Sequence, residues 1–156
     1  MGAFYRKSDP LHEPPDMWYL DWLTWLIPDK LYRLHELCRM SRDLCRYTPH
    51  KAMEDLDAES VFVGDVLCVG SKARRMGLGS ELVRRSRELA EGFGSEVYFV
   101  KATGVRSQAL FDKAGFNVLR EYEYDKILDK YGRILINDAR EHKVVKTMFV
   151  RLNGSK

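Results

Sequence analysis

A basic, glycine-rich turn, RRMGLG from Arg74 to Gly79, carries the clearest chemical signal in this sequence. It follows an apolar run, Val61 to Val69, that predicts a strand buried on both faces. Leucines at helical spacing after the turn predict an amphipathic helix that begins there. The backbone N–H groups of a helix N-terminus attract anions, and glycine lets the backbone approach them closely. The turn therefore predicts a site for a phosphate or, better, a pyrophosphate.

The two best-known glycine motifs do not match this turn. A P-loop needs Lys and then Ser or Thr directly after its last glycine, but Gly79 is followed by Ser80 and Glu81. A dinucleotide-binding fingerprint needs a third glycine where Leu82 stands. What remains is the pattern R-x-x-G-x-G over residues 74–79, which a plain strand-to-helix turn can also produce.

The chain divides into three stretches of different composition. Its 156 residues are of ordinary length for one domain, and 45% of them are hydrophobic, which is enough for a core. Residues 1–16 contain three prolines and predict a flexible lead-in. Residues 17–58 predict an N-terminal helical segment, with one helix over 30–46. Residues 59–152 contain the glycine-rich turn and predict the domain that binds the anion.

Segment 17–27, MWYLDWLTWLI, holds all three tryptophans and a single charged residue. It is too short to cross a bilayer, which needs about 20 residues. The segment predicts a core helix or strand. The alternative is an exposed patch that binds a membrane surface, a partner, or a second copy of the chain in a homodimer.

The remaining elements follow from apolar runs that polar turns separate. Residues 47–59 are polar and acidic and predict a loop. After the amphipathic helix come a strand, a short helix, a strand, a long polar loop and an edge-capable strand, at 97–101, 107–113, 116–123, 124–143 and 144–152. The order β-α-β-α-β-loop-β predicts an α/β (or α+β) fold, a mixed sheet with flanking helices. Its first two strands are parallel because a helix connects them.

Composition and cysteine usage narrow the classes of function. The net charge of +3 is mild, and the Lys and Arg residues clustered in 72–87 fit a phosphate-bearing ligand at least as well as DNA, so no nucleic-acid partner is expected. Cys38, Cys45 and Cys68 are odd in number and lack metal-ligand spacing, which predicts reduced thiols, no metal and a cytoplasmic location. The N-terminal residues lack the apolar core of a secretory signal, and neither a membrane anchor nor a membrane partner is expected.

Taken together, the motifs resemble those of the GCN5-related N-acetyltransferase (GNAT) superfamily. In that superfamily the R-x-x-G-x-G turn follows a strand, and a later short helix ends in a Gly-Phe pair, here Gly115 and Phe116. The closing segment, His142 to Val150, is similar to that of insect-type arylalkylamine N-acetyltransferases, which acetylate amines such as dopamine and serotonin. The resemblance covers residues 59–152 and implies transfer of an acetyl group from acetyl-CoA to a small-molecule primary amine.

The resemblance also implies where acetyl-CoA, the co-substrate, binds. Backbone groups near the end of the first strand would bind the pantetheine arm, at Leu67, Cys68 and Val69. The turn and the helix start would bind the pyrophosphate, at Arg74, Arg75, Met76, Gly77, Leu78, Gly79 and Ser80.

Amine acetylation needs a base, because alkylammonium groups have pKa values of about 10. Asp65, four residues before Val69, is the candidate and would act through a water molecule; the alternative is a carboxylate that pairs with an arginine or is simply solvated. Phe111 stands where many superfamily members have a tyrosine acid, and it cannot donate a proton. Thr103 and Ser107 match hydroxyl positions of the insect-type enzymes and are candidates to orient the amine or protonate the thiolate. Their alternative roles are a turn hydroxyl and a helix cap.

The N-terminal part departs from the family pattern. A complete fold of this superfamily has further strands and helices before the first strand of the predicted domain, whereas residues 1–58 show no such series. The sequence thus predicts a fold whose N-terminal part is shortened or missing. Two classes of function remain open: an acetyl-CoA-dependent amine N-acetyltransferase, or a catalytically inactive CoA-binding fragment that acts as an interaction or regulatory module. A third possibility, an acetyltransferase for protein N-termini or lysines, differs from the first only in the substrate loop, over residues 124–143.

Overall fold

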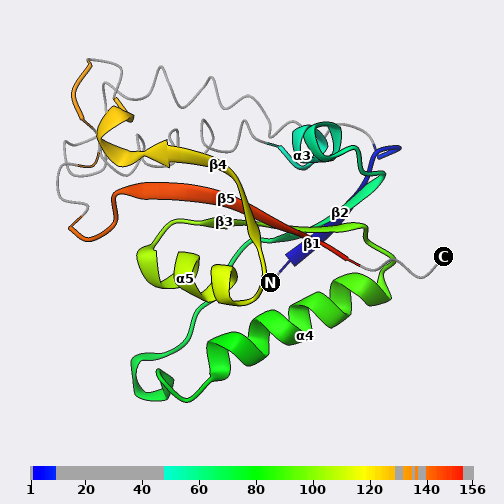
Figure 1. The fold of residues 1–156 in the computed structure, drawn as a ribbon, viewed down its shortest axis with the longest axis horizontal. Helices are drawn as coiled ribbons and strands as arrows, with labels where there is room; N and C mark the ends of the chain where they lie inside the picture. The colour runs from blue at the N-terminus through cyan, green and yellow to red at the C-terminus, as the bar shows by residue number, and fades with distance from the viewer. Residues whose placement is uncertain (1, 10–47, 129–131, 135, 137–139, 153–156) are drawn as a thin grey trace, which may run out of the picture.

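A five-stranded mixed sheet with helices on both faces forms the protein in the computed structural model, which describes residues 2–9, 48–128, 132–134, 136 and 140–152 (Figure 1). The strands are β1 (Gly2–Arg6), β2 (Ser60–Gly64), β3 (Val97–Ala102), β4 (Asn117–Glu123) and β5 (Val144–Arg151). The helices are α3 (Pro49–Leu56), α4 (Leu78–Gly92) and α5 (Val105–Lys113), with 3₁₀ turns η2 (Ser71–Ala73) and η3 (Tyr124–Lys126).

The strand order in the sheet is β1-β2-β3-β5-β4. β2 and β3 are parallel and are connected through α4, whereas the pairs β1–β2, β3–β5 and β5–β4 are antiparallel. The order of elements from β2 to β5 is the predicted one, and the predicted mixed sheet with flanking helices is confirmed.

Two apolar layers, one on each face of the sheet, form the core. Alternation along β2 directs Phe62 to one face and Val61 and Val63 to the other. α4 and α5 cover the Phe62 face, below the sheet in Figure 1, and α3 covers the opposite face. The α4 and α5 layer includes Tyr98, Val100, Phe111, Phe116 and Met148, and the α3 layer includes Met53, Leu56, Val97 and Phe99.

The N-terminal residues differ from the predicted flexible lead-in. Residues 2–6 form β1, which pairs with β2 so that Phe4 lies opposite Phe62. Phe4 also stacks on Phe93, with ring centroids 5.9 Å apart. A neighbouring strand and an aromatic contact, both distant in sequence, therefore order this segment. The predictions for segment 17–27, including its contact with a second copy, and for the helix over 30–46 lie outside the described residues.

Residues 47–59 contain α3, so the prediction of a loop there was wrong. Thr48 caps this helix, because its Oγ1 accepts a hydrogen bond from the Lys51 N–H at 3.2 Å, and Pro49 occupies the first helical position. Of the acidic residues that suggested a loop, Asp55 lies in the helix and pairs with Arg120 of β4, and Asp57 is the C-cap of the helix. None of the helices in the described part of the chain is long and apolar enough to cross a membrane.

The last strand also has a different position from the predicted one. Residues 144–152 were expected to form an edge-capable strand, but β5 lies between β3 and β4 and pairs with both. Its Val145 and Met148 are almost fully buried, as an interior strand requires. β4 is the edge strand instead, and most of its side chains are exposed.

Candidate functional site

The parallel ladder between β2 and β3 opens at the end of β2. Its last pair is Gly64 and Val100; β3 continues to Ala102, whereas the chain after Gly64 leaves the sheet and runs to η2. The prediction of a strand up to Val69 was therefore wrong, since the ladder stops at Gly64 and apolar side chains such as Val66, 64% exposed, are not core residues. The two strands part here, and the opening is the entrance to a cavity.

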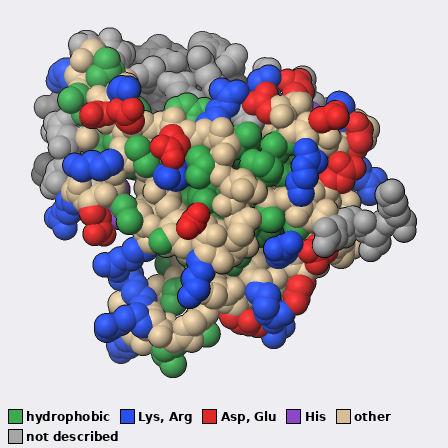
Figure 2. Space-filling view, viewed as in Figure 1, with side chains coloured by type: hydrophobic (Ala, Val, Ile, Leu, Met, Phe, Trp, Pro, Cys, Tyr) green, Lys and Arg blue, Asp and Glu red, His purple; other side chains and the backbone are tan. Residues whose placement is uncertain are grey.

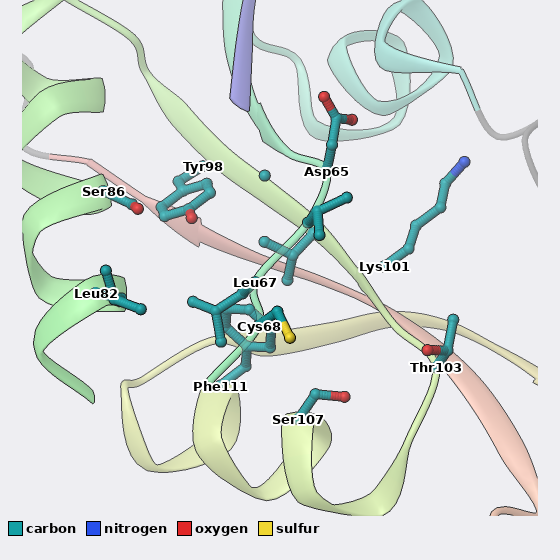
Figure 3. Close-up of a pocket in the computed structure, with 13 residues that line it drawn as sticks. Asp65, Leu67, Cys68, Leu82, Ser86, Tyr98, Lys101, Thr103, Ser107 and Phe111 are labelled. Carbon is teal, nitrogen blue, oxygen red and sulfur yellow. The ribbon is translucent and has the colours of Figure 1, made fainter. Parts of the chain in front are cut away.

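This cavity, which we call the acceptor pocket, has a volume of about 440 Å³ (Figure 3). The loop after β2, the end of β3 and the facing sides of α4 and α5 form its walls. The catalytic candidates Asp65, Thr103 and Ser107 all line it, together with Leu67 and Cys68. Side chains separated by up to 42 positions, 107 minus 65, thus meet in one cavity.

A second cavity of about 690 Å³, which we call the basic pocket, lies at the glycine-rich turn. Figure 2 shows Lys and Arg side chains gathered at the lower left, over the turn between β2 and α4. Cys68 lines the acceptor pocket and Val69 the basic pocket, so the two cavities are adjacent along one loop. The basic pocket is lined by the predicted residues Val69, Arg74, Arg75, Gly77, Leu78 and Gly79, and by Ser71, Lys72, Ala73 and Arg106.

Two of the predicted pyrophosphate residues do not line the basic pocket. Met76 is 71% exposed and lies in the turn outside the cavity lining. Ser80 lines a separate groove between α4 and α5. Arg106, which the sequence analysis did not select, joins the basic pocket because it lies in the first turn of α5.

The backbone at the start of α4 is arranged for an anion. Gly77 is the N-cap residue with φ 77°, a left-handed conformation that glycine adopts readily, and no side chain caps the first turn. The N–H groups of that turn are therefore open to a ligand at the positive end of the helix dipole. Among the described residues, Lys72, Arg75 and Arg106 form no ion pair with a carboxylate, so their charges remain available to an anion.

The two hydroxyl candidates of the acceptor pocket have different surroundings. Ser107 Oγ donates a hydrogen bond to the Gly104 carbonyl at 2.8 Å and accepts one from the Gly104 N–H at 3.2 Å. This side chain holds the first turn of α5, which is the cap role weighed above. The Thr103 hydroxyl forms no hydrogen bond within the described part of the chain, so it is the hydroxyl more available to a ligand.

The acceptor pocket also contains residues that sequence reasoning missed. Tyr98 is buried, yet its hydroxyl reaches the pocket beside Gly64 and hydrogen-bonds with Ser86. Burial raises the pKa of Tyr98, and the hydrogen bond to Ser86 offsets part of this effect. Lys101 lines the pocket from the end of β3. In sequence, Tyr98 and Lys101 look like ordinary strand residues, and only the opening of the ladder gives them a place in the site.

Two further residues support the turn between β3 and α5. The Tyr124 hydroxyl donates a hydrogen bond to the Thr103 carbonyl at 2.7 Å, and burial raises the pKa of this tyrosine. The Val105 N–H donates a hydrogen bond to Nδ1 of His142 at 3.1 Å. Both side chains come from the region between β4 and β5, so that region fixes the backbone that carries Thr103.

A comparison with protein families decides where the chain belongs. The sequence profile of the acetyltransferase (GNAT) family matches residues 12–116, well over half of the chain. The chain belongs to the GNAT family. The match begins before residue 59, the first residue of the resemblance found in the sequence, and so includes part of the N-terminal region.

Solved structures of insect acetyltransferases share this GNAT fold. Arylalkylamine N-acetyltransferase 2 from Aedes aegypti matches 97% of the chain with a TM-score of 0.66 and 23% identity. The polyamine N-acetyltransferase of Drosophila melanogaster, which forms N-acetylagmatine, matches 97% with a TM-score of 0.69 and 19% identity. The chain spans 66% and 68% of the lengths of these two proteins, and at such identities the likeness is one of fold. No curated protein sequence matches the chain.

The Phe residue of the Gly-Phe pair in this GNAT chain supports the aromatic side chains that line the acceptor pocket. Phe116 is buried and packs on Phe111 and Tyr98, with ring centroids 5.0 and 5.2 Å away. Phe111 lines the acceptor pocket from α5 and contributes an apolar wall but no proton donor. The aromatic cluster therefore positions the Tyr98 ring, whose hydroxyl is the polar group at this end of the pocket.

Proposed function

We propose that this chain transfers an acetyl group from acetyl-CoA to the nitrogen of a primary amine. One observation carries the proposal: a basic cavity and a cavity with a carboxylate and hydroxyls lie next to each other along the same loop. The basic cavity suits the phosphates of acetyl-CoA, and the cavity with the carboxylate and hydroxyls suits the thioester and the amine that react. Arylalkylamines such as dopamine and serotonin are the first acceptors to test, since structures with this fold include arylalkylamine N-acetyltransferases.

The basic pocket fits the pyrophosphate of CoA. Arg74 and Arg75 on the turn and Arg106 on α5 bring guanidinium groups, which bind phosphate oxygens strongly, to one cavity. The first-turn N–H groups of α4 add neutral donors at the helix N-terminus. The absence of a side chain at Gly77 leaves the backbone open, with nothing within 4 Å of the Cβ that another residue would have.

The loop after β2 would align the donor with the acceptor pocket. Leu67 and Cys68 lie beyond the last pair of the ladder, outside the sheet, and their backbone N–H and C=O groups can bind the amide groups of the pantetheine arm. Bound acetyl-CoA supplies a thioester carbonyl that a neutral amine attacks. Backbone N–H groups of this loop would stabilise the oxyanion that forms, which typically contributes about 3 kcal/mol per donor.

Asp65 is the base in this proposal. It lines the acceptor pocket, it is exposed, and no Arg or Lys lies within ion-pair distance of it among the described residues. It is therefore free to accept the ammonium proton through a water molecule. Thr103, whose hydroxyl has no other role, would orient the amine or protonate the leaving thiolate, and Ser107 would act through the α5 turn that it caps.

Thiol release from acetyl-CoA in the presence of primary amines tests the proposal. We expect steady turnover by the wild-type chain and a decrease in kcat/KM of about 100-fold or more in Asp65→Asn, the usual effect of removing a general base. Asp112→Asn removes a carboxylate on the exposed side of α5, outside both pockets, and is the matched control that should retain activity. Equal rates for the two variants would contradict the role of Asp65.

A catalytically inactive CoA-binding module is the second candidate. The observation in its favour is the buried Phe111, which lines the pocket but offers no proton to the thiolate. Binding of CoA without thiol release for any amine would support this candidate over the first.

A further inference from the structure

We propose that the acceptor amine carries an anionic group and that Lys101 binds it. This inference rests on the proposed acetyl transfer and specifies the class of its acceptor. It comes from the relationship between Lys101 and Asp65, two opposite charges that line the same pocket.

Both residues directly follow the last pair of the parallel ladder. That pair is Gly64 and Val100, so Asp65 is the first residue after β2 and Lys101 is the next residue along β3. Partners in this ladder project to the same face; Val63 and Phe99, for example, both belong to the α3 layer. By alternation along β3, Lys101 projects to the face of Phe99, away from α4 and α5.

The close-up view agrees with this direction. In Figure 3 the Asp65 and Lys101 side chains extend toward the upper part of the view, and Ser107 lies below them on α5. The basic pocket is lined by the turn before α4 and by the starts of α4 and α5, and Lys101 is not part of it. Lys101 lines the acceptor pocket instead, so its charge is not needed for the phosphates of the donor.

The two charges do not neutralise each other. No ion pair joins Asp65 to Lys101, and neither forms one with another residue in the described ranges. Nearby lysines on the sheet behave differently; Lys146, on β5, pairs with Glu121 at 2.8 Å. A separated carboxylate and ammonium in one cavity complement a ligand that carries both an ammonium and an anion.

An acceptor with only positive charge would meet Lys101 without compensation. A simple arylalkylamine or a polyamine brings its ammonium toward Asp65 but gains nothing at Lys101, and like charges in a pocket repel. A carboxylated arylalkylamine, such as an aromatic amino acid, satisfies both side chains. The pocket volume of about 440 Å³ leaves room for an aromatic ring of this class.

Two bisubstrate probes test this inference without relying on turnover. In each, the sulfur of CoA is joined through an acetyl bridge to an amine nitrogen, that of tryptophan in one and that of tryptamine in the other. The probes differ only in a carboxylate. We expect the tryptophan probe to bind the wild-type chain about fivefold more tightly in calorimetry, as for a partly exposed ion pair.

In Lys101→Met the ratio of the two dissociation constants should fall to about one, while the affinity for CoA itself stays unchanged. Lys101→Gln serves as a second variant should Met disturb the fold, and Lys113→Met, on α5 outside both pockets, should keep the wild-type ratio. Equal affinities in the wild type, or a ratio that persists in both Lys101 variants, would overturn the inference. Failure of CoA itself to bind would instead contradict the proposed function.

Discussion

A Cβ atom on Gly64 would lie 2.8 Å from the Tyr98 hydroxyl oxygen, so the two residues fit together only because position 64 has no side chain. The Tyr98 side chain extends from β3 to the end of β2, and its ring packs on Phe62 and Phe116. The close contact sits where the ladder opens. The same glycine that ends β2 thus leaves space for the tyrosine that forms one end of the acceptor pocket.

Replacing this glycine should damage both stability and the site. Gly64→Ala forces the Tyr98 ring to move against a packed aromatic cluster, which typically costs about 1–3 kcal/mol of unfolding free energy. Urea denaturation measures this loss, and thiol release measures the accompanying decrease in acetyl transfer. Gly70→Ala is the control, because nothing lies within 4 Å of a Cβ there and φ is −55°. Similar stability of the two variants would contradict the close fit.

The anion site at α4 predicts different effects of two substitutions at Gly77. Gly77→Ala and Gly77→Glu share the strain of a side chain at φ 77°, about 1–2 kcal/mol, but only the glutamate adds a negative charge at the phosphate position. We expect Gly77→Glu to abolish CoA binding in calorimetry and Gly77→Ala to weaken it moderately. Unchanged CoA affinity in Gly77→Glu would contradict the assignment of the basic pocket to the pyrophosphate of CoA.

Removing the two hydroxyls of the acceptor pocket should have different effects, one mainly on stability and the other mainly on activity. Ser107→Ala removes both hydrogen bonds to Gly104 and should lower the unfolding free energy by about 1 kcal/mol. Thr103→Val leaves the fold intact, since its hydroxyl has no bond to lose in the described structure, but should lower kcat. Thermal unfolding and thiol release, measured on both variants, check this contrast. It fails if Thr103→Val is the less stable of the two.

The central part of the fold was predictable because its signals are local. Glycines at both ends of α4 and the apolar runs around it defined α4, β3 and α5 with small errors at their boundaries, and they located the start of β2 but not its end. β1 was not predictable, because residues 2–6 become a strand only when β2 provides hydrogen-bonding partners. α3 was not predicted although Thr48 and Pro49 form a regular helix start, because the run of acidic residues after them is also typical of a loop.

The residues of the candidate site that belong to a sequence motif were predictable, whereas those that only long-range contacts bring to the site were not. The glycine-rich turn identified Gly77 and its neighbours from spacing alone. Lys101 and Tyr98 lie in an ordinary strand pattern, and Tyr124 supports the site from the far end of β4. Nothing in the sequence shows that the ladder stops at Gly64, and this long-range event creates the pocket.

Glu81, in the first turn of α4, should make the stability of the folded chain depend on pH in the acidic range. Hydrogen bonds from Arg84 and then Arg85 lower the pKa of Glu81 from 4.5 to about 2. Because the folded pKa is lower than the unfolded one, this stabilisation is complete above about pH 4.5 and is lost as pH falls toward 2. The difference in melting temperature between wild type and Glu81→Gln should therefore shrink as pH falls from neutral to about 3. A difference independent of pH would contradict the ion-pair origin.

The initial rate of thiol release, measured while acetyl-CoA and an amine are varied together, tests the central claim most directly. The basic pocket and the acceptor pocket meet along one loop, so the amine should attack the bound thioester directly, and reciprocal plots should intersect. Cys68→Ala, which removes the thiol lining the acceptor pocket, should leave this pattern in place. Parallel lines that disappear in Cys68→Ala would mean that the enzyme itself is acetylated first. No thiol release with any amine, from a chain that binds CoA, would contradict the proposed acetyl transfer.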